Sequence, residues 1–260
     1  MRFQTSVSFR MILIAIALAL IGCSNEGART GLAPLGPNAQ SAQASTADPN
    51  ATRIAPPFVP GNFVNGVQNL YFPLVPGTVL IYRQETPDGV ETDTVTVTHD
   101  TKNILGVTTF VVHDAVYVNG ALKEDTFDWY APDKDGNVWY FGEDTKELGP
   151  PVSTVGSWEA GKNGAQAGLI MLAHPQMGDT YNQENAPGVV QDQARVKGLN
   201  ETATVPYGTF TGCVKTQEWT PIEPGNRAFK FYASGFGTVL EVPNQGGGPV
   251  ELISVIRPAP

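Results

Sequence analysis

The chain of 260 residues carries 25 acidic and 16 basic residues, a formal net charge of −9, and 41% of its residues are hydrophobic. An acidic chain argues against binding to nucleic acid and against electrostatic docking on anionic lipid. Its length is sufficient for one substantial hydrophobic core.

The N-terminus has the three zones of a secretory signal. Residues 1–10 carry two arginines and no acid, residues 11–21 are an uninterrupted apolar run, and Gly22 and Cys23 follow. A basic region before a short apolar run is typical of a signal peptide. The run is shorter than the roughly 20 apolar residues that a transmembrane helix needs. We therefore expect a signal peptide over residues 1–22.

The last four residues of this region, Leu20-Ile21-Gly22-Cys23, resemble the bacterial lipobox. In proteins with that motif the cysteine receives diacylglycerol, the peptide is cut before it, and the new amine is usually acylated, here with palmitate by our expectation. The resemblance implies a lipoprotein of the bacterial cell envelope, anchored to a membrane through lipid on Cys23. Ser24 is compatible with the outer membrane if the cell is Gram-negative. The alternative is an ordinary signal peptide in which Cys23 is incidental.

Residues 23–55 are predicted to be a lipidated, disordered tether. The stretch from Ser24 to about Asn50 is rich in Ala, Ser, Gly, Gln, Asn and Pro, and it has almost no large apolar residues. Such a composition does not support a packed core. The remainder, residues 56–260, is expected to form one domain.

The sequence contains two cysteines, so lipidation of Cys23 leaves Cys213 as the single thiol of the mature protein. No intrachain disulfide is then available. Cys213 lies in the strand-like run 210–214, which favours burial as a small hydrophobic residue over a role as a reactive thiol.

After residue 70, short runs of β-branched and aromatic residues alternate with turns that contain Gly and Pro. The predicted strands, in chain order, are residues 78–85, 92–98, 105–118, 121–130, 138–142, 168–172, 189–199, 210–219, 228–234, 238–242 and 250–256. Residues 191–197 offer a weak helical alternative. Successive strands with short turns predict a mainly β fold, a single antiparallel domain whose meander sheet is curved or partly closed as a barrel or half-barrel.

Several stretches resemble one family of uncharacterised bacterial lipoproteins with secreted β-domains. They read DWYA at 128–131, GNVWYFGE at 136–143, GSWEAG at 156–161, VPYGTF at 205–210 and EWTP at 218–221. The resemblance covers most of residues 70–256. It implies a lipid-anchored β-domain but no catalytic residues, because that family carries no assigned activity.

Two turns give an expected register for the central strands. Asn119-Gly120 predicts a two-residue hairpin turn, since both turn positions need positive φ, and this turn pairs Asp114 with Asp125. For the next hairpin we assume a register that pairs Asp125 with Glu143. Directly paired residues share one face of a sheet.

On this register one face is strongly aromatic and forms either core or a ligand-binding surface. Its members are Phe110, Val112, Phe127, Trp129, Trp139 and Phe141. The candidate ligand-binding residues among them are Phe127, Trp129, Trp139 and Phe141.

Asp114, Asp125 and Glu143 would form a row across the same face. Adjacent carboxylates repel one another unless one is protonated or a cation bridges them. The row therefore predicts either a Ca²⁺ site, since Ca²⁺ takes oxygen ligands, or an acid with a raised pKa. The alternatives are a solvated rim or a bulge that breaks the assumed register.

The opposite face would hold His113, Glu124 and Asp128. This cluster could act as acid and base, although an ordinary polar face would have the same composition.

No Gly-x-Ser-x-Gly, His-Glu-x-x-His, Cys-x-x-Cys or Walker motif occurs in the sequence. We expect no cofactor apart from the Ca²⁺ considered above. The leading hypothesis is a lipid-anchored, non-enzymatic β-domain that binds an apolar small molecule or an envelope protein. The alternatives are an envelope hydrolase or calcium-dependent enzyme that uses the carboxylates, and a structural component of the envelope.

Replacing Cys23 by alanine should abolish lipidation, because the thiol is the acceptor. Metabolic labelling with radioactive palmitate should mark the unaltered chain and not the Cys23→Ala variant. Thiol labelling of the denatured variant should then detect Cys213 alone. Palmitate incorporation that persists in the variant would contradict the lipobox assignment.

Overall fold

The structure of the chain is a computed structural model that describes residues 52–66 and 68–259. The predicted signal peptide, Cys23 and most of the predicted tether lie outside the described residues. Among the residues that are described, no helix is long and apolar enough to cross a membrane.

Thirteen strands and one short 3₁₀ turn, η1 (Pro60–Asn62), make up the secondary structure of the described residues. The strands are β1 (Val79–Thr86), β2 (Gly89–Ile104), β3 (Val107–Val118), β4 (Ala121–Pro132), β5 (Val138–Glu147), β6 (Trp158–Glu159), β7 (Gly168–Met171), β8 (Thr180–Asn182), β9 (Gln193–Val205), β10 (Gly208–Trp219), β11 (Arg227–Ala233), β12 (Gly237–Pro243) and β13 (Val250–Ile256).

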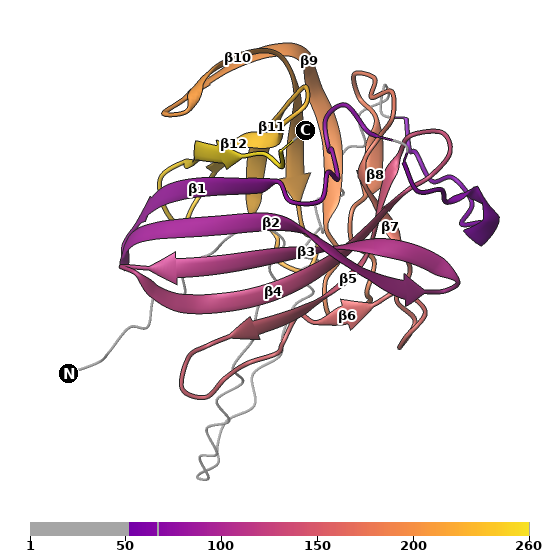
Figure 1. Ribbon diagram of the computed structural model, residues 1–260, viewed down its shortest axis with the longest axis horizontal. Helices are drawn as coiled ribbons and strands as arrows, with labels where there is room; N and C mark the ends of the chain where they lie inside the picture. The colour runs from indigo at the N-terminus through magenta and orange to yellow at the C-terminus, as the bar shows by residue number, and fades with distance from the viewer. Residues whose placement is uncertain (1–51, 67, 260) are drawn as a thin grey trace, which may run out of the picture.

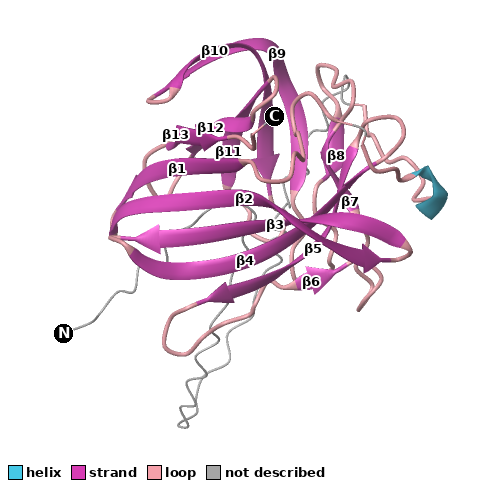
Figure 2. Ribbon diagram, viewed as in Figure 1, coloured by secondary structure: helices cyan, strands magenta, loops and turns pink. Residues whose placement is uncertain are grey.

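All thirteen strands belong to one sheet with the order β6-β5-β4-β3-β2-β1-β13-β12-β11-β10-β9-β8, and β7 pairs with β5 off this path. The named strand pairs are antiparallel. β1 to β5 form a meander, and the later strands turn back over it, so that β13 lies beside β1 (Figures 1 and 2). The prediction of a mainly β, curved antiparallel sheet is confirmed.

The sheet is not closed into a barrel, but its two ends meet. Gln166, just before β7, forms an isolated bridge with Asn185, just after β8, and its N–H donates to the Asn185 carbonyl at 2.8 Å. A side chain at Gly168 would meet the carbonyl oxygen of Gln183 at 2.2 Å. Glycine therefore permits this close approach of backbone to backbone.

The Asn119-Gly120 turn forms as predicted. Both residues have positive φ, 50° and 79°, and Val118 pairs with Ala121 across the turn. The next turn also forms, with the Asp133 N–H donating to the Asn137 carbonyl at 2.9 Å.

The assumed register beyond the first turn is wrong, because a bulge at Lys123 adds one residue to β4. Tyr117 pairs with Leu122, but Val116 pairs with Glu124, and Asp114 then pairs with Thr126 instead of Asp125. Since side chains alternate between faces, a shift of one residue exchanges the faces of all the residues that follow.

The assumed register of the second hairpin is also wrong. Trp139 pairs with Ala131, not with Trp129, and a second irregularity lies between Asp128 and Tyr130. Gly142 sits in this irregular part of β5 with φ 127°, where an added side chain would meet the Trp158 carbonyl at 2.2 Å. The predicted pairing of Asp125 with Glu143 therefore does not form, and Glu143 pairs with Asp128.

Two short strands, β6 and β8, were not predicted from the sequence, and β2, β5 and β9 extend several residues beyond the predicted strands. β6 and β8 contain two and three residues, which are too few to show a period in the sequence. Residues 193–197 are part of β9 and not a helix, because cross-strand pairing with β10 decides the conformation there.

The larger hydrophobic core packs side chains of β2 to β5 and β7 against those of β8 to β11 and of the loops around them. The segment before β1 covers part of this core. Phe58 and Phe63 pack edge-on against Trp139 and Phe141, with ring centroids 5.4 to 6.1 Å apart. A second, smaller core includes Cys213, which is buried as predicted.

Candidate functional site

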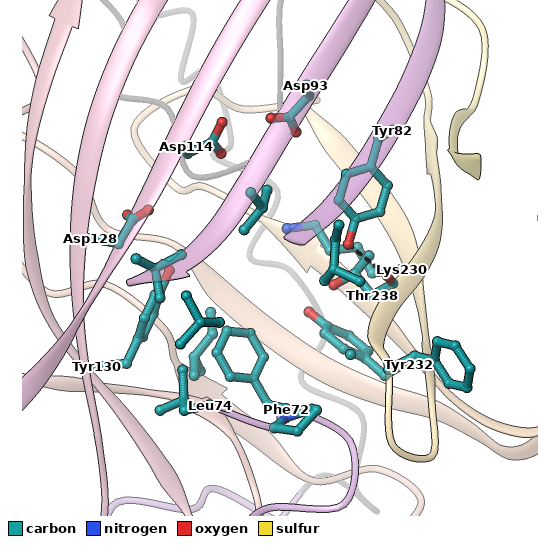
Figure 3. A pocket seen from close by; sticks show the side chains of 18 of the residues that line it. Phe72, Leu74, Tyr82, Asp93, Asp114, Asp128, Tyr130, Lys230, Tyr232 and Thr238 are labelled. Carbon is teal, nitrogen blue, oxygen red and sulfur yellow. Dashed lines mark hydrogen bonds between the residues drawn. The ribbon is translucent and has the colours of Figure 1, made fainter. Parts of the chain in front are cut away.

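A cavity of about 110 Å³ lies where the curled sheet faces itself, between β1 to β4 on one side and β11 to β13 on the other. Apolar side chains make up most of its lining, with three aspartates on one side and polar side chains such as Lys230 on the other (Figure 3). The apolar members include Leu74, Leu80, Val95, Val97, Val112, Ile170 and Val250, with Phe72, Pro73 and Phe236 from the segments outside the strands.

Three of the acidic side chains in the lining, Asp93, Asp114 and Asp128, come from β2, β3 and β4 (Figure 3), and Glu241 on β12 lines the other side. All three aspartate side chains are buried. Burial raises the pKa of Asp114 well above its usual range, and the charge of Asp93 raises it further. Asp114 therefore keeps its proton to a higher pH than a free aspartate does, beside a second carboxyl group.

The hydroxyl of Tyr140 connects Asp128 to Glu143. It donates to Oδ1 of Asp128 at 2.6 Å and lies 3.1 Å from Oε2 of Glu143. A hydroxyl has one proton to donate, so Tyr140 can serve as the donor to only one of these two carboxyl groups at a time. Burial raises the pKa of Glu143 well above its usual range, with the charge of Glu184 adding to the shift, in agreement with this arrangement.

The opposite wall contains the cation of the cavity, Lys230 on β11. Its Nζ lies 3.0 Å from Oε2 of Glu218 and 3.7 Å from Oε2 of Glu241. Oε1 of Glu218 also accepts from the hydroxyls of Tyr232 and Thr216, each at 2.7 Å. Lys230 is thus held charged, because two carboxylates offset the cost of its burial.

Acidic groups outnumber cations in the interior. Of the residues that the structure describes, eleven Asp and Glu are buried, against Lys230 as the one buried Lys or Arg. The acids are Glu91, Asp93, Asp114, Glu124, Asp128, Asp133, Glu143, Asp179, Glu184, Glu218 and Glu241. Such a set is tolerated only when groups are protonated, hydrogen-bonded or paired.

The predicted aromatic ligand surface is divided in the structure. Phe127 stacks on His113 with ring centroids 4.5 Å apart, and Trp129 lies under Nζ of Lys102, 3.1 Å from the ring centroid. Trp139 and Phe141 are packed into the core beneath the segment before β1. The four residues therefore do not form one binding face.

The predicted metal candidates are also separated. Asp114 and Glu143 face the interior, whereas Asp125 lies on the opposite face of β4, with its Oδ1 2.6 Å from Nε2 of His113. Within residues 52–66 and 68–259, no group of three or more His, Cys, Asp or Glu side chains is arranged to hold a metal ion. The row proposed from the sequence does not form, because the bulge at Lys123 moves Asp125 to the other face.

The predicted polar cluster is divided for the same reason. His113 pairs with Asp125 on one face, while Glu124 and Asp128 point to the other. Oε1 of Glu124 accepts from the Thr126 hydroxyl at 3.0 Å.

A second cavity, of about 360 Å³, lies near β6. Trp129, Trp158, Glu143 and Glu159 are among its lining residues. It brings together one predicted ligand residue, Trp129, and one predicted metal candidate, Glu143.

Sequence reasoning missed Asp93 and Lys230 as site residues. The signal for Asp93 was present, because Asp93, Val95 and Val97 follow the two-residue period and all line the cavity. Lys230 lies between Phe229 and Phe231, which pack on the other face of β11 against Lys215. Its partners are distant in sequence, so no local pattern shows them.

No family model matches the chain, and no curated protein matches it. The family resemblance seen in the sequence therefore stays a prediction. Among solved structures, the chain is similar to a candidate lipoprotein from Parabacteroides distasonis ATCC 8503, with a TM-score of 0.43 and 13% sequence identity. The alignment covers 73% of this chain and 99% of the other.

The stability of the protein should fall as the pH rises from 5 to 8. Burial raises the pKa of Asp128 to about 7, against about 3.9 for an unperturbed aspartate. The folded state therefore retains a proton that the unfolded chain has lost, and this stabilisation is complete below pH 4 and lost as the pH rises through 7. For this one group the free energy of unfolding should drop by roughly 2.5 kcal/mol, measured by urea denaturation.

Asp128→Asn should reduce this dependence of stability on pH. The matched control is Asp144→Asn on neighbouring β5, which should leave the dependence unchanged because the Asp144 side chain is 50% exposed. Stability that stays constant or rises over the same range would contradict the assignment of protonated interior carboxyl groups.

Proposed function

We propose that this chain is a lipid-anchored protein of the bacterial cell envelope whose β-domain binds a small ligand with an apolar body in the cavity between β1–β4 and β11–β13. The anchor rests on the lipobox resemblance at Cys23. The ligand rests on one observation, the partly open cavity lined mainly by apolar side chains. Ligand sites of proteins are typically apolar pockets with a few convergent polar groups.

The size of the cavity limits the ligand. At 110 Å³ it is smaller than a 150 Å³ engineered cavity that binds benzene. A body of about four to seven carbon atoms is consistent with this volume, because the cavity is partly open.

Two aromatic residues of the lining, Phe72 and Phe236, are packed against neighbouring side chains. Phe236 packs against Phe210 with ring centroids 4.9 Å apart, and the guanidinium of Arg257 lies 4.7 Å from the Phe236 ring. Phe72 packs against Tyr130 at 5.1 Å. Because neighbours hold these side chains in place, they give this part of the lining a defined shape.

Narrowing the cavity should abolish binding. Val95 is half-buried and lines the cavity from β2, whereas Thr96 alternates to the opposite face of the same strand. We expect Val95→Phe to lower the affinity for a panel of small alcohols, amines and carboxylates with four to seven carbon atoms by at least tenfold, because the added ring occupies their space. Thr96→Phe is the matched control and should change the affinity less than twofold.

The measurement is isothermal titration calorimetry on the purified full-length chain in detergent, with native mass spectrometry to detect a co-purified molecule. If no member of the panel binds the unaltered protein, or if Val95→Phe binds every member as well as Thr96→Phe does, the cavity is not a ligand site.

A second function, hydrolysis, is favoured by one observation at the other cavity. Oε1 of Glu143 is buried without a hydrogen-bond partner, and Glu143 lines that cavity with Trp129 and Trp158. A carboxyl group with a raised pKa is suited to act as a general acid. Turnover in a screen of esters and glycosides that Glu143→Gln abolishes would support hydrolysis, and absence of turnover would remove it.

A further inference from the structure

The side of the cavity with the aspartates has an unusual pair of carboxyl groups. Asp93 is 1% exposed and Asp114 is 7% exposed, and they come from the adjacent strands β2 and β3. Both carboxylate oxygens of Asp93 and Oδ1 of Asp114 are buried without a hydrogen-bond partner. Leaving a buried acceptor unsatisfied costs about 1–3 kcal/mol, and more when it is charged.

Lys230, the cation of the cavity, does not neutralise Asp93 and Asp114. The Nζ of Lys230 is engaged by Glu218 at 3.0 Å and lies 3.7 Å from Glu241. Figure 3 shows Asp93 and Asp114 at one end of the cavity, with Lys230 on the other wall. Asp93 and Asp114 interact with each other, and the hydrogen bond to Asp93 helps Asp114 to keep its proton. Outside the pair, these oxygens have no hydrogen-bond partner among the described residues, so a positive group from outside the chain would find acceptors there.

The acidic pair is continuous with the apolar lining. Val95 and Val97 follow Asp93 along β2, and Val112 precedes Asp114 on β3, all on the same face of the sheet. A molecule that reaches the carboxyl groups would thus bury its hydrocarbon part against valine side chains, and each buried CH₂ contributes about 0.8 kcal/mol.

We propose that the cavity binds a small primary amine, with its ammonium group held by Asp93 and Asp114 and its short hydrocarbon body against Val95, Val97 and Val112. This inference rests on the proposed function and names the class of ligand. An ammonium group carries three N–H donors and a positive charge, which match the unpartnered oxygens. A carboxylate ligand would be repelled by the charge of Asp93, and an alcohol would leave that charge uncompensated.

A metal ion is a poorer match for this pair. Hard cations such as Ca²⁺ take six to eight oxygen ligands, and the described residues contain no cluster of three or more side chains placed to hold one. The apolar lining has no ligand atoms for a metal ion, whereas it favours the hydrocarbon part of an amine.

The test compares matched ligands on the unaltered full-length chain in detergent at pH 8. The pairs are hexylamine with hexanol and benzylamine with benzyl alcohol, with hexanoate as the anionic member. We expect each amine to bind at least tenfold more tightly than its alcohol and hexanoate not to bind, as measured by isothermal titration calorimetry.

Asp93→Asn should then lower the affinity for the amines by at least tenfold and change that for the alcohols by less than threefold. Asp144→Asn, an exposed carboxylate on β5, is the control that should leave both unchanged. The comparison of ligands on the unaltered protein remains decisive if Asp93→Asn does not fold.

The outcomes separate the two proposals. If alcohols bind as tightly as amines and Val95→Phe weakens their binding, the cavity is an apolar ligand site but the proposal of an amine ligand is wrong. Tight binding of hexanoate would also overturn it. If no ligand binds, the amine and the ligand site are both wrong.

Discussion

The burial of many carboxyl groups inside one curled sheet is the constraint on which this structure depends. A charged carboxylate taken out of water is costly unless a proton, a hydrogen bond or a cation compensates it. The wall around Lys230 meets the constraint with ion pairs and the hydroxyls of Thr216 and Tyr232. The wall formed by β2 to β5 meets it with protons, with the Tyr140 hydroxyl and with the hydrogen bond between Asp114 and Asp93.

The distribution of these groups explains why the cavity is asymmetric. At the apolar end, side chains from the segment before β1 and from the β11–β12 turn fill the space between the two halves of the sheet. At the acidic end, closer packing would bring more carboxyl groups together and raise the electrostatic cost. The cavity is thus a place where the fold accepts imperfect packing, which is a common property of binding sites.

Much of the fold could be predicted from the sequence, because turn chemistry and the two-residue period are local. Asn119-Gly120 fixed its hairpin, and most strands were found within a few residues of their observed ends. The candidate site could not be predicted in the same way. One extra residue at Lys123 moved Asp125 and Phe127 to the other face, and a bulge of this kind has no clear signal in the sequence. Asp93 lines the same cavity as residues of β11 and β12 only because the whole sheet curls, and this path cannot be predicted from local sequence patterns.

The contact between residues 52–54 and β8 has a consequence for how copies of the protein behave together. β8 is an outer strand of the sheet, and Arg53 bridges to Thr180 there, while the Ile54 N–H donates to the Thr180 carbonyl at 2.8 Å. An uncovered outer strand presents backbone groups on which another chain can add, leading to aggregation. Residues 52–54 thus cover part of the β8 edge. A chain shortened past Ile54 would expose the backbone groups of β8 to other copies of the protein.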